Sequence, residues 1–110
     1  MLSRPQDFAA IQERGTYRSH PLLAARILRT DLGATRFGLA TGRVLGPAVV
    51  RNRVRRRLRA ALRALSPGLR PGWDVLIIAR PAVIGSDYGT LIEALRRLLI
   101  KGGVIGGSGT

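Results

Sequence analysis

The sequence of 110 residues has no cysteine, a single histidine and few acidic residues. Without cysteine the chain can form neither a disulfide framework nor a thiolate metal site. The histidine, His20, stands beside Pro21 with no second imidazole available, so we interpret it as an ordinary loop or strand residue. No apolar stretch approaches the roughly 18 residues of a membrane span, and none near the start resembles a signal peptide. We therefore expect a cytoplasmic protein with no membrane partner.

The 6 acidic residues are also scattered, since no two of them lie within four residues of each other. No metal–carboxylate cluster and no general acid–base pair for phosphodiester cleavage is therefore evident. We expect no catalytic residue, no metal ligand and no tightly bound cofactor on this chain. Aromatic residues are few, and we expect most of them in the core. Phe8 is the candidate for stacking on a nucleic-acid base, with core packing as the alternative.

Basic residues, by contrast, are abundant: Lys and Arg together number 19, and the formal net charge is +13 at pH 7. Such an excess destabilises a compact chain by self-repulsion, which binding to a polyanion relieves. All but Lys101 are arginine. The planar fork of arginine suits paired phosphate oxygens, although a GC-rich genome would produce the same bias, and composition leaves both explanations open.

The apolar pattern predicts one α+β domain in which three helices pack on a small four-stranded sheet. In the order α-β-β-β-α-β-α, the predicted elements are helix 4–14, strands 17–19, 22–28 and 36–41, helix 48–65, strand 73–80, and a last helix that Ser86–Asp87 caps and Gly102 ends. A turn at 30–33 would make the second and third strands an antiparallel hairpin. We expect the domain to span residues 1–101 and the Gly-rich residues 102–110 to form a mobile tail.

The central helix, Ala48–Leu65, is predicted to separate apolar residues from charge. Its apolar side chains fall within about a third of the circumference, and arginines occupy most of the rest. From Leu32 to Trp73 no acidic residue occurs, so no ion pair between i and i+4 can neutralise the helix from within. A solvated charged face is the ordinary alternative. Because solvent-exposed helices usually mix charges of both signs, the all-arginine face favours a nucleic-acid partner.

The stretch RFGLATGRVLGPAVVRNRVRRRLR (Arg36–Arg59) resembles the signature of the bacterial ribonuclease P protein subunit. The family pattern of hydrophobic–Gly–x–Ala–Val–x–Arg–Asn–Arg–x–basic–Arg fits Leu45–Arg56 throughout. Similarities at Asp7–Phe8, Gly15–Thr16 and Ile77–Pro81 extend the resemblance over about residues 4–100.

The resemblance implies a subunit of an endoribonuclease whose catalytic centre lies on a partner RNA. In that family the RNA uses Mg²⁺ to cleave the 5′ leader from precursor tRNA, and no protein partner is required. The resemblance implies that the partner RNA is bound by Arg43, Arg51, Asn52, Arg53, Arg55, Arg56 and Arg59. It also implies a leader-binding cleft between the first helix and the sheet, with Phe8, Gln12 and Arg26. The family's βαβ crossover is left-handed, an exception to the usual rule.

The chain departs from the family pattern at three places. The family usually has aromatic residues where this chain has Gln12 and Arg26, and two basic residues where it has Arg43 and Val44. These departures affect the stacking of the leader and leave the RNA face intact.

The alternative functions that share a basic helix are a small ribosomal or RNA-chaperone protein, and a DNA-binding protein with the arginine helix in the major groove. Co-purification of one structured RNA, of ribosomal particles or of duplex DNA would separate the three.

Overall fold

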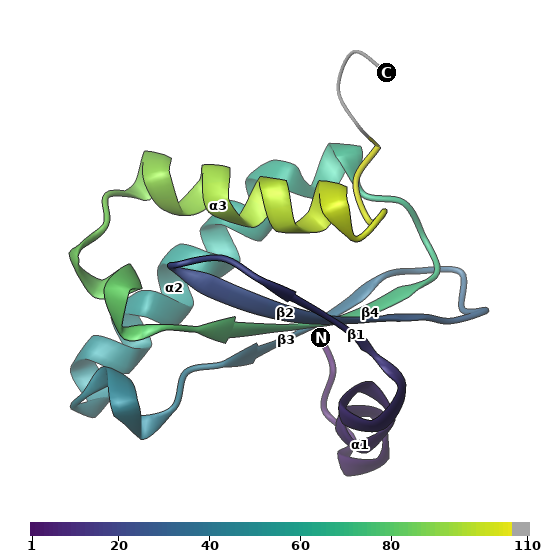
Figure 1. The fold of residues 1–110 in the computed structure, drawn as a ribbon, viewed down its shortest axis with the longest axis horizontal. Helices are drawn as coiled ribbons and strands as arrows, with labels where there is room; N and C mark the ends of the chain where they lie inside the picture. Colours follow the sequence, from purple (N-terminus) through teal and green to yellow (C-terminus); the bar gives the residue numbers. More distant parts are fainter. Residues whose placement is uncertain (107–110) are drawn as a thin grey trace.

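The computed structural model describes residues 1–106, in which three helices and four strands follow one another in the predicted order. The elements are α1 (Pro5–Arg14), β1 (Thr16–Ser19), β2 (Leu23–Arg29), β3 (Arg36–Ala40), α2 (Ala48–Leu65), β4 (Trp73–Ala79) and α3 (Tyr88–Lys101) (Figure 1). Short 3₁₀ segments occur at Arg43–Leu45, Ser66–Gly68 and Pro81–Gly85. The predicted bounds of each helix and strand agree with these to within one residue.

The strands form one mixed sheet in the order β1-β2-β4-β3. The hairpin predicted between β2 and β3 is wrong, because β4 lies between them, antiparallel to β2 and parallel to β3. The physical reason is burial: the continuous apolar run Val75–Ala79 in β4 is covered on both faces only in the middle of the sheet. The chain therefore passes from β3 through α2 to its parallel neighbour β4. The left hand of this crossover, which the resemblance implies, stays a prediction.

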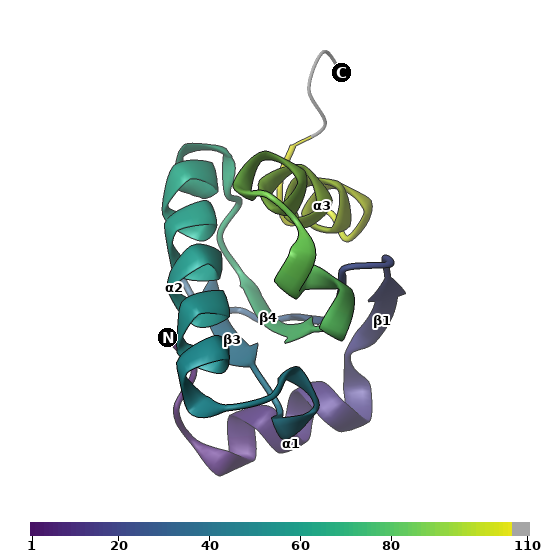
Figure 2. The same ribbon diagram turned by 90° about the vertical axis from the view of Figure 1, so that its left-hand side faces the viewer.

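Helices cover the two faces of the sheet unequally. α2 and α3 pack on one face and α1 on the other, and Figure 2 shows α1 on the far side of the sheet from α3. The larger core lies under α2 and α3, where Leu58, Leu91 and Leu95 have no exposed surface. A smaller cluster of Leu2, Ile11 and Leu76 holds α1 to the sheet. None of the helices described for residues 1–106 is both long and apolar enough to span a membrane.

An ion-pair network also connects α1 to the sheet. Arg36 on β3 donates from Nε and Nη2 to the two carboxylate oxygens of Asp74 at 2.9 and 2.7 Å, and from Nη1 to Asp7 of α1 at 3.3 Å. The hydrogen bonds to Asp74, opposed in part by desolvation, raise the pKa of Arg36 above its ordinary value. Asp74 is only 3% exposed, so Arg36 also compensates its buried charge.

The domain extends beyond the boundary predicted at residue 101. Val104 and Ile105 are buried, the Val104 N–H donates to the carbonyl of Leu99, and Leu69 and Ile105 form an isolated β-bridge. The first half of the segment expected to be a mobile tail is therefore packed on α3, because its two apolar residues complete the core. Residues 107–110 lie outside the described part of the chain.

Candidate nucleic-acid interface

Helix α2 has the two faces that its sequence predicts. Val54, Leu58, Ala61 and Leu62 are buried against the sheet and α3. The helix is uninterrupted by Gly or Pro and ends in the 3₁₀ segment Ser66–Gly68. Because the apolar stripe holds one face inward, the arginines of the opposite face are directed away from the core.

The arginines of α2 have no acidic partner in the described part of the chain. All ion pairs among residues 1–106 involve Arg36, Arg96 or Arg97. No acidic side chain in this part of the chain forms an ion pair with an arginine of α2. A helix face of one sign, fixed in place by a core on its other side, is suited to bind an external polyanion.

The predicted RNA-binding residues lie on α2, from Arg51 to Arg59, and on the 3₁₀ segment before it. Arg43, Asn52, Arg53, Arg56 and Arg59 are exposed, whereas Arg51 and Arg55 are half-buried. Six of the seven lie along roughly two and a half turns of α2, Arg43 lies on the 3₁₀ segment before it, and none of the seven is buried. We call this surface, with all seven residues, the α2 arginine face.

Arg55 is tied into the fold more closely than its neighbours. Its Nη2 donates to Oγ1 of Thr41 at 2.6 Å, and its Nη1 donates to Oδ1 of Asn52 at 3.0 Å. Thr41 is only 7% exposed and follows the end of β3. The guanidinium therefore connects the sheet to the exposed amide of Asn52, and with the amide oxygen already bonded the NH₂ group is left to donate outward.

Arg57, which was not among the predicted residues, has a role within the fold. Its Nη2 donates to the backbone carbonyl of Ser86 at 2.7 Å, and this bond holds α2 to the segment before α3. By contrast, Nε of Arg51 is buried without a hydrogen-bond partner among residues 1–106. A buried donor in this state is costly unless it finds an acceptor, such as one from a ligand.

On the opposite face of the sheet lie the residues predicted for leader binding. Phe8 of α1 is half-buried and packs with Leu76 and the smaller cluster, and a side-chain carbon on Gly38 would come within 2.8 Å of its ring. The absence of a side chain at Gly38 thus makes room for the ring. Phe8 is therefore partly a core residue and partly exposed, and its stacking on a base stays a prediction.

Arg26 lies in the same cross-strand row as Leu76 and Gly38. Gln12, the third residue predicted for the leader, is exposed on α1. Arg26 on β2 faces Leu76 on β4 as its cross-strand partner, and Leu76 in turn faces Gly38. Because directly opposed residues share a face of the sheet, Arg26 lies on the side of α1 and Phe8.

Two residues on this face were missed by the sequence interpretation. Tyr17 on β1 is 48% exposed, although most aromatic residues were expected in the core, and the guanidinium carbon of Arg26 lies 5.2 Å from the centre of its ring. Arg80, which follows β4, donates from Nη2 to the hydroxyl of Tyr17 at 2.9 Å and to that of Ser19 at 2.7 Å. No local signal in the sequence could have found them, because they come together only through the pairing of β1 with β2 and the position of Arg80 after β4.

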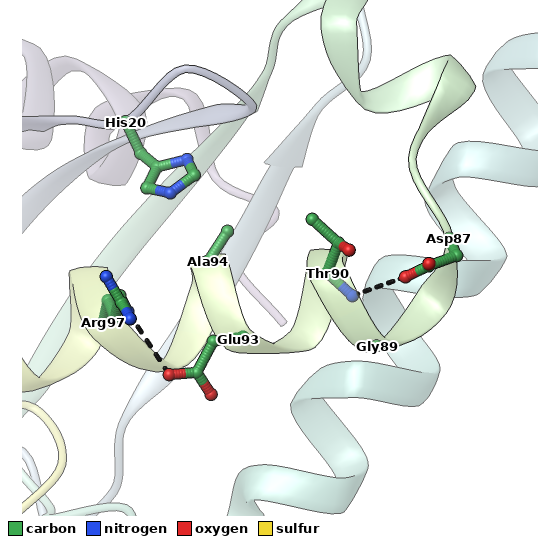
Figure 3. Close-up of a pocket in the computed structure, with 7 residues that line it drawn as sticks. All are labelled: His20, Asp87, Gly89, Thr90, Glu93, Ala94 and Arg97. Atoms are coloured by element: carbon green, nitrogen blue, oxygen red, sulfur yellow. Dashed lines mark hydrogen bonds and ion pairs between the residues drawn. The ribbon is translucent and has the colours of Figure 1, made fainter.

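A pocket beside α3 has a different character (Figure 3). It is lined by His20, Asp87, Gly89, Thr90, Glu93, Ala94 and Arg97. His20 accepts the backbone N–H of Leu22 at Nδ1, and Asp87 caps α3 by accepting the N–H of Thr90, which lowers the pKa of Asp87. Glu93 is paired with two arginines of α3. His20 lies in the loop between β1 and β2, as expected, and these bonds give His20, Asp87 and Glu93 partners within the chain.

The fold and the α2 arginine face define a class of protein: an α+β domain with a basic helix face suited to bind nucleic acid. The sequence also matches the family described as Ribonuclease P over residues 1–102. It is 37% identical to the ribonuclease P protein component of Herpetosiphon aurantiacus over 89% of this chain and 80% of the relative. It is 34% identical to that of Synechocystis over 91% of this chain and 82% of the relative.

Solved structures agree with this match at the level of the fold. The RNase P protein of Staphylococcus aureus superposes with a TM-score of 0.86 at 20% identity, covering 96% of each chain. That of Thermotoga maritima gives 0.84 at 24% identity, covering 91% of this chain and 94% of the other. The chain therefore belongs to the ribonuclease P protein family. Neither the ribosomal nor the DNA-binding alternative is needed to explain the basic helix.

Proposed function

We propose that this protein acts as the subunit of ribonuclease P that binds the catalytic RNA through α2 and holds the 5′ leader of precursor tRNA on the other side of the sheet. Its family makes it an RNA-binding component of a tRNA-processing endonuclease. The proposal adds that the two RNAs are bound on opposite faces of the sheet, the catalytic RNA by α2 and the leader on the side of α1. It also implies that the protein acts in the cytoplasm and that the substrate is precursor tRNA.

The observation that carries the proposal is the α2 arginine face. Its charges have no acidic partner among residues 1–106, and its helix is anchored by a buried apolar stripe. Arginine forks bind phosphate oxygens, and the outward NH₂ of Asn52 suits an acceptor on a base, a 2′-hydroxyl or a phosphate. Together these groups support binding to a structured RNA, which offers both phosphates and base edges.

We place the cleavage chemistry on the partner RNA. Among residues 1–106 no three His, Cys, Asp or Glu side chains come together in a way that could hold a metal ion. The acids that form ion pairs are engaged by arginines: Asp7 and Asp74 by Arg36, and Glu93 by Arg96 and Arg97. These residues do not fit a Mg²⁺ site, so we derive no catalytic step on this chain. Its contribution is to bind and to position.

The leader would lie across the sheet face that α1 covers only in part. There Phe8 offers a half-exposed ring over Gly38, and Arg26 offers a cation in the same row. Gln12 adds a hydrogen-bonding group on the exposed side of α1. Stacking on one aromatic side chain contributes about 1–3 kcal/mol per base.

The test is reconstitution from separate components. We expect RNA-free protein to leave precursor tRNA uncut, the partner RNA alone to cut it slowly at high Mg²⁺, and the mixture to cut it at low Mg²⁺. In the assembled complex, Phe8→Ala should weaken the binding of leader-bearing precursor about 10-fold or more. Binding of mature tRNA serves as the control and should hardly change. Cleavage with multiple turnovers by RNA-free protein would refute the assignment of catalysis to the RNA.

A further inference from the structure

An exposed tyrosine on the edge strand β1 is held between two arginines. The guanidinium of Arg26 lies over the ring of Tyr17, and Nη2 of Arg80 donates to the hydroxyl of the same tyrosine. Arg80 also donates to Ser19, the last residue of β1. These contacts come from β1, its neighbour β2 and the end of β4, which is distant in sequence, and together they fix the orientation of one ring.

The position of Tyr17 is not explained by core packing. About half of its surface, 48%, is exposed, and every residue of β1 is exposed. A cation–π contact and a hydroxyl bond at an exposed site each contribute only modestly to stability. They do restrict the rotation of the side chain, which lowers the entropy lost when a ligand stacks on it.

The surroundings of the ring carry positive charge. No acidic side chain bonds Arg26 or Arg80 among residues 1–106, and Nε of Arg80 is buried without a partner there. An aromatic surface flanked by unneutralised guanidinium groups is the combination that binds single-stranded nucleic acid, since the ring takes the base and the cations take the phosphates.

We propose that Tyr17, Arg26 and Arg80 form a nucleotide subsite, the β1 subsite, for an unpaired base of the leader strand. It is separate from the position of Phe8. Phe8 packs over Gly38 and Leu76 on β3 and β4, and Tyr17 lies two to three strand spacings away in the same row, roughly 10–14 Å. Two rings that far apart contact different bases.

Arg26 supplies no ring, but it covers one face of Tyr17 and so presents a ring from the neighbouring strand. This inference rests on the proposed function, because it assumes a leader strand on this face of the sheet.

The experiment uses the complex of full-length protein and partner RNA with precursors whose leaders are shortened one nucleotide at a time. In the wild type, each leader nucleotide that is bound adds a step in affinity. Tyr17→Leu should remove one step, a loss of about 5-fold or more. Tyr17→Phe, which keeps the ring and loses the bond to Arg80, should retain most of that step. Tyr88→Leu is the matched control, since Tyr88 is 40% exposed at the start of α3 and should leave all steps unchanged.

An abasic nucleotide at the leader position assigned to Tyr17 provides a test that needs no variant. It should reproduce the loss in the wild type and add nothing further in Tyr17→Leu. Phe8→Ala should remove a different step. If Tyr17→Leu leaves every step intact, or if Tyr17→Phe loses as much as Tyr17→Leu, the β1 subsite is wrong while leader binding at Phe8 stands. If the wild type shows no leader steps at all, the proposed leader-binding function fails as well.

Discussion

The division of α2 into a core face and an RNA face predicts opposite phenotypes for two neighbouring residues. Leu58 has no exposed surface and belongs to the larger core, so Leu58→Ala removes buried methyl groups and leaves a cavity. Substitutions of this kind cost about 2–5 kcal/mol. For a domain whose total stability is of order 5–15 kcal/mol, that is a large fraction. Arg56 is exposed, and its replacement should change stability by less than about 0.5 kcal/mol.

In RNA binding the order is reversed. If Arg56 contacts one phosphate, Arg56→Ala should weaken binding about 10-fold and flatten the plot of log affinity against log salt by roughly one unit, because one counterion fewer is released. Leu58→Ala, in conditions where the variant is folded, should keep the wild-type slope. Arg57→Ala is the matched arginine control, since Arg57 donates to the backbone of Ser86 and should cost stability with little change of slope.

Both quantities are measurable on the same preparations. Urea unfolding of the free protein, followed by circular dichroism, gives the stability, and filter binding to the partner RNA over a range of salt concentrations gives the slope. Equal stability losses in Arg56→Ala and Leu58→Ala would refute the division of the helix. A flattened slope in Leu58→Ala with an unchanged slope in Arg56→Ala would refute it equally.

Two further predictions concern groups that hold the faces in place. Thr41→Val removes one acceptor of Arg55 and so loosens the guanidinium that positions the amide of Asn52. We expect RNA binding to weaken about 2- to 10-fold while Thr41→Ser stays near wild type; equal binding by the two variants would contradict this. Asp74→Asn breaks the two-bond pairing with Arg36, and urea unfolding should show a loss of about 1–3 kcal/mol, less than for a fully buried pair because the Arg36 side chain is 31% exposed. An unchanged unfolding midpoint would mean that the pair contributes nothing net.

Local signals in the sequence were sufficient for the elements and for the basic face. Helix α2 begins after Gly46–Pro47 and ends at Ser66–Gly68, where the predicted breaks occur, and Asp87 caps α3 as expected. Helix periodicity alone separated the buried stripe from the arginines, because both properties depend only on residues a few positions apart. The motif in Arg36–Arg59 was long enough to indicate the family.

Tertiary structure decided which strands are neighbours. A turn such as that at residues 30–33 reverses the chain whether or not its two flanking strands pair, so β4 could enter between β2 and β3 without leaving a local signal. The same holds for Val104 and Ile105, two apolar residues in a Gly-rich segment that pack because the core has room for them.

The convergence of Tyr17, Arg26 and Arg80 shows the same limit at the site itself. The three residues lie on different strands or just beyond one, and only the antiparallel register that pairs Tyr17 with Arg26, together with the end of β4, brings them together. Periodicity assigns a residue to a face of its own element. Which other residues share that face depends on strand order and register, and these are set by the burial of the whole chain, so a sheet surface built from several strands is visible only in the folded structure.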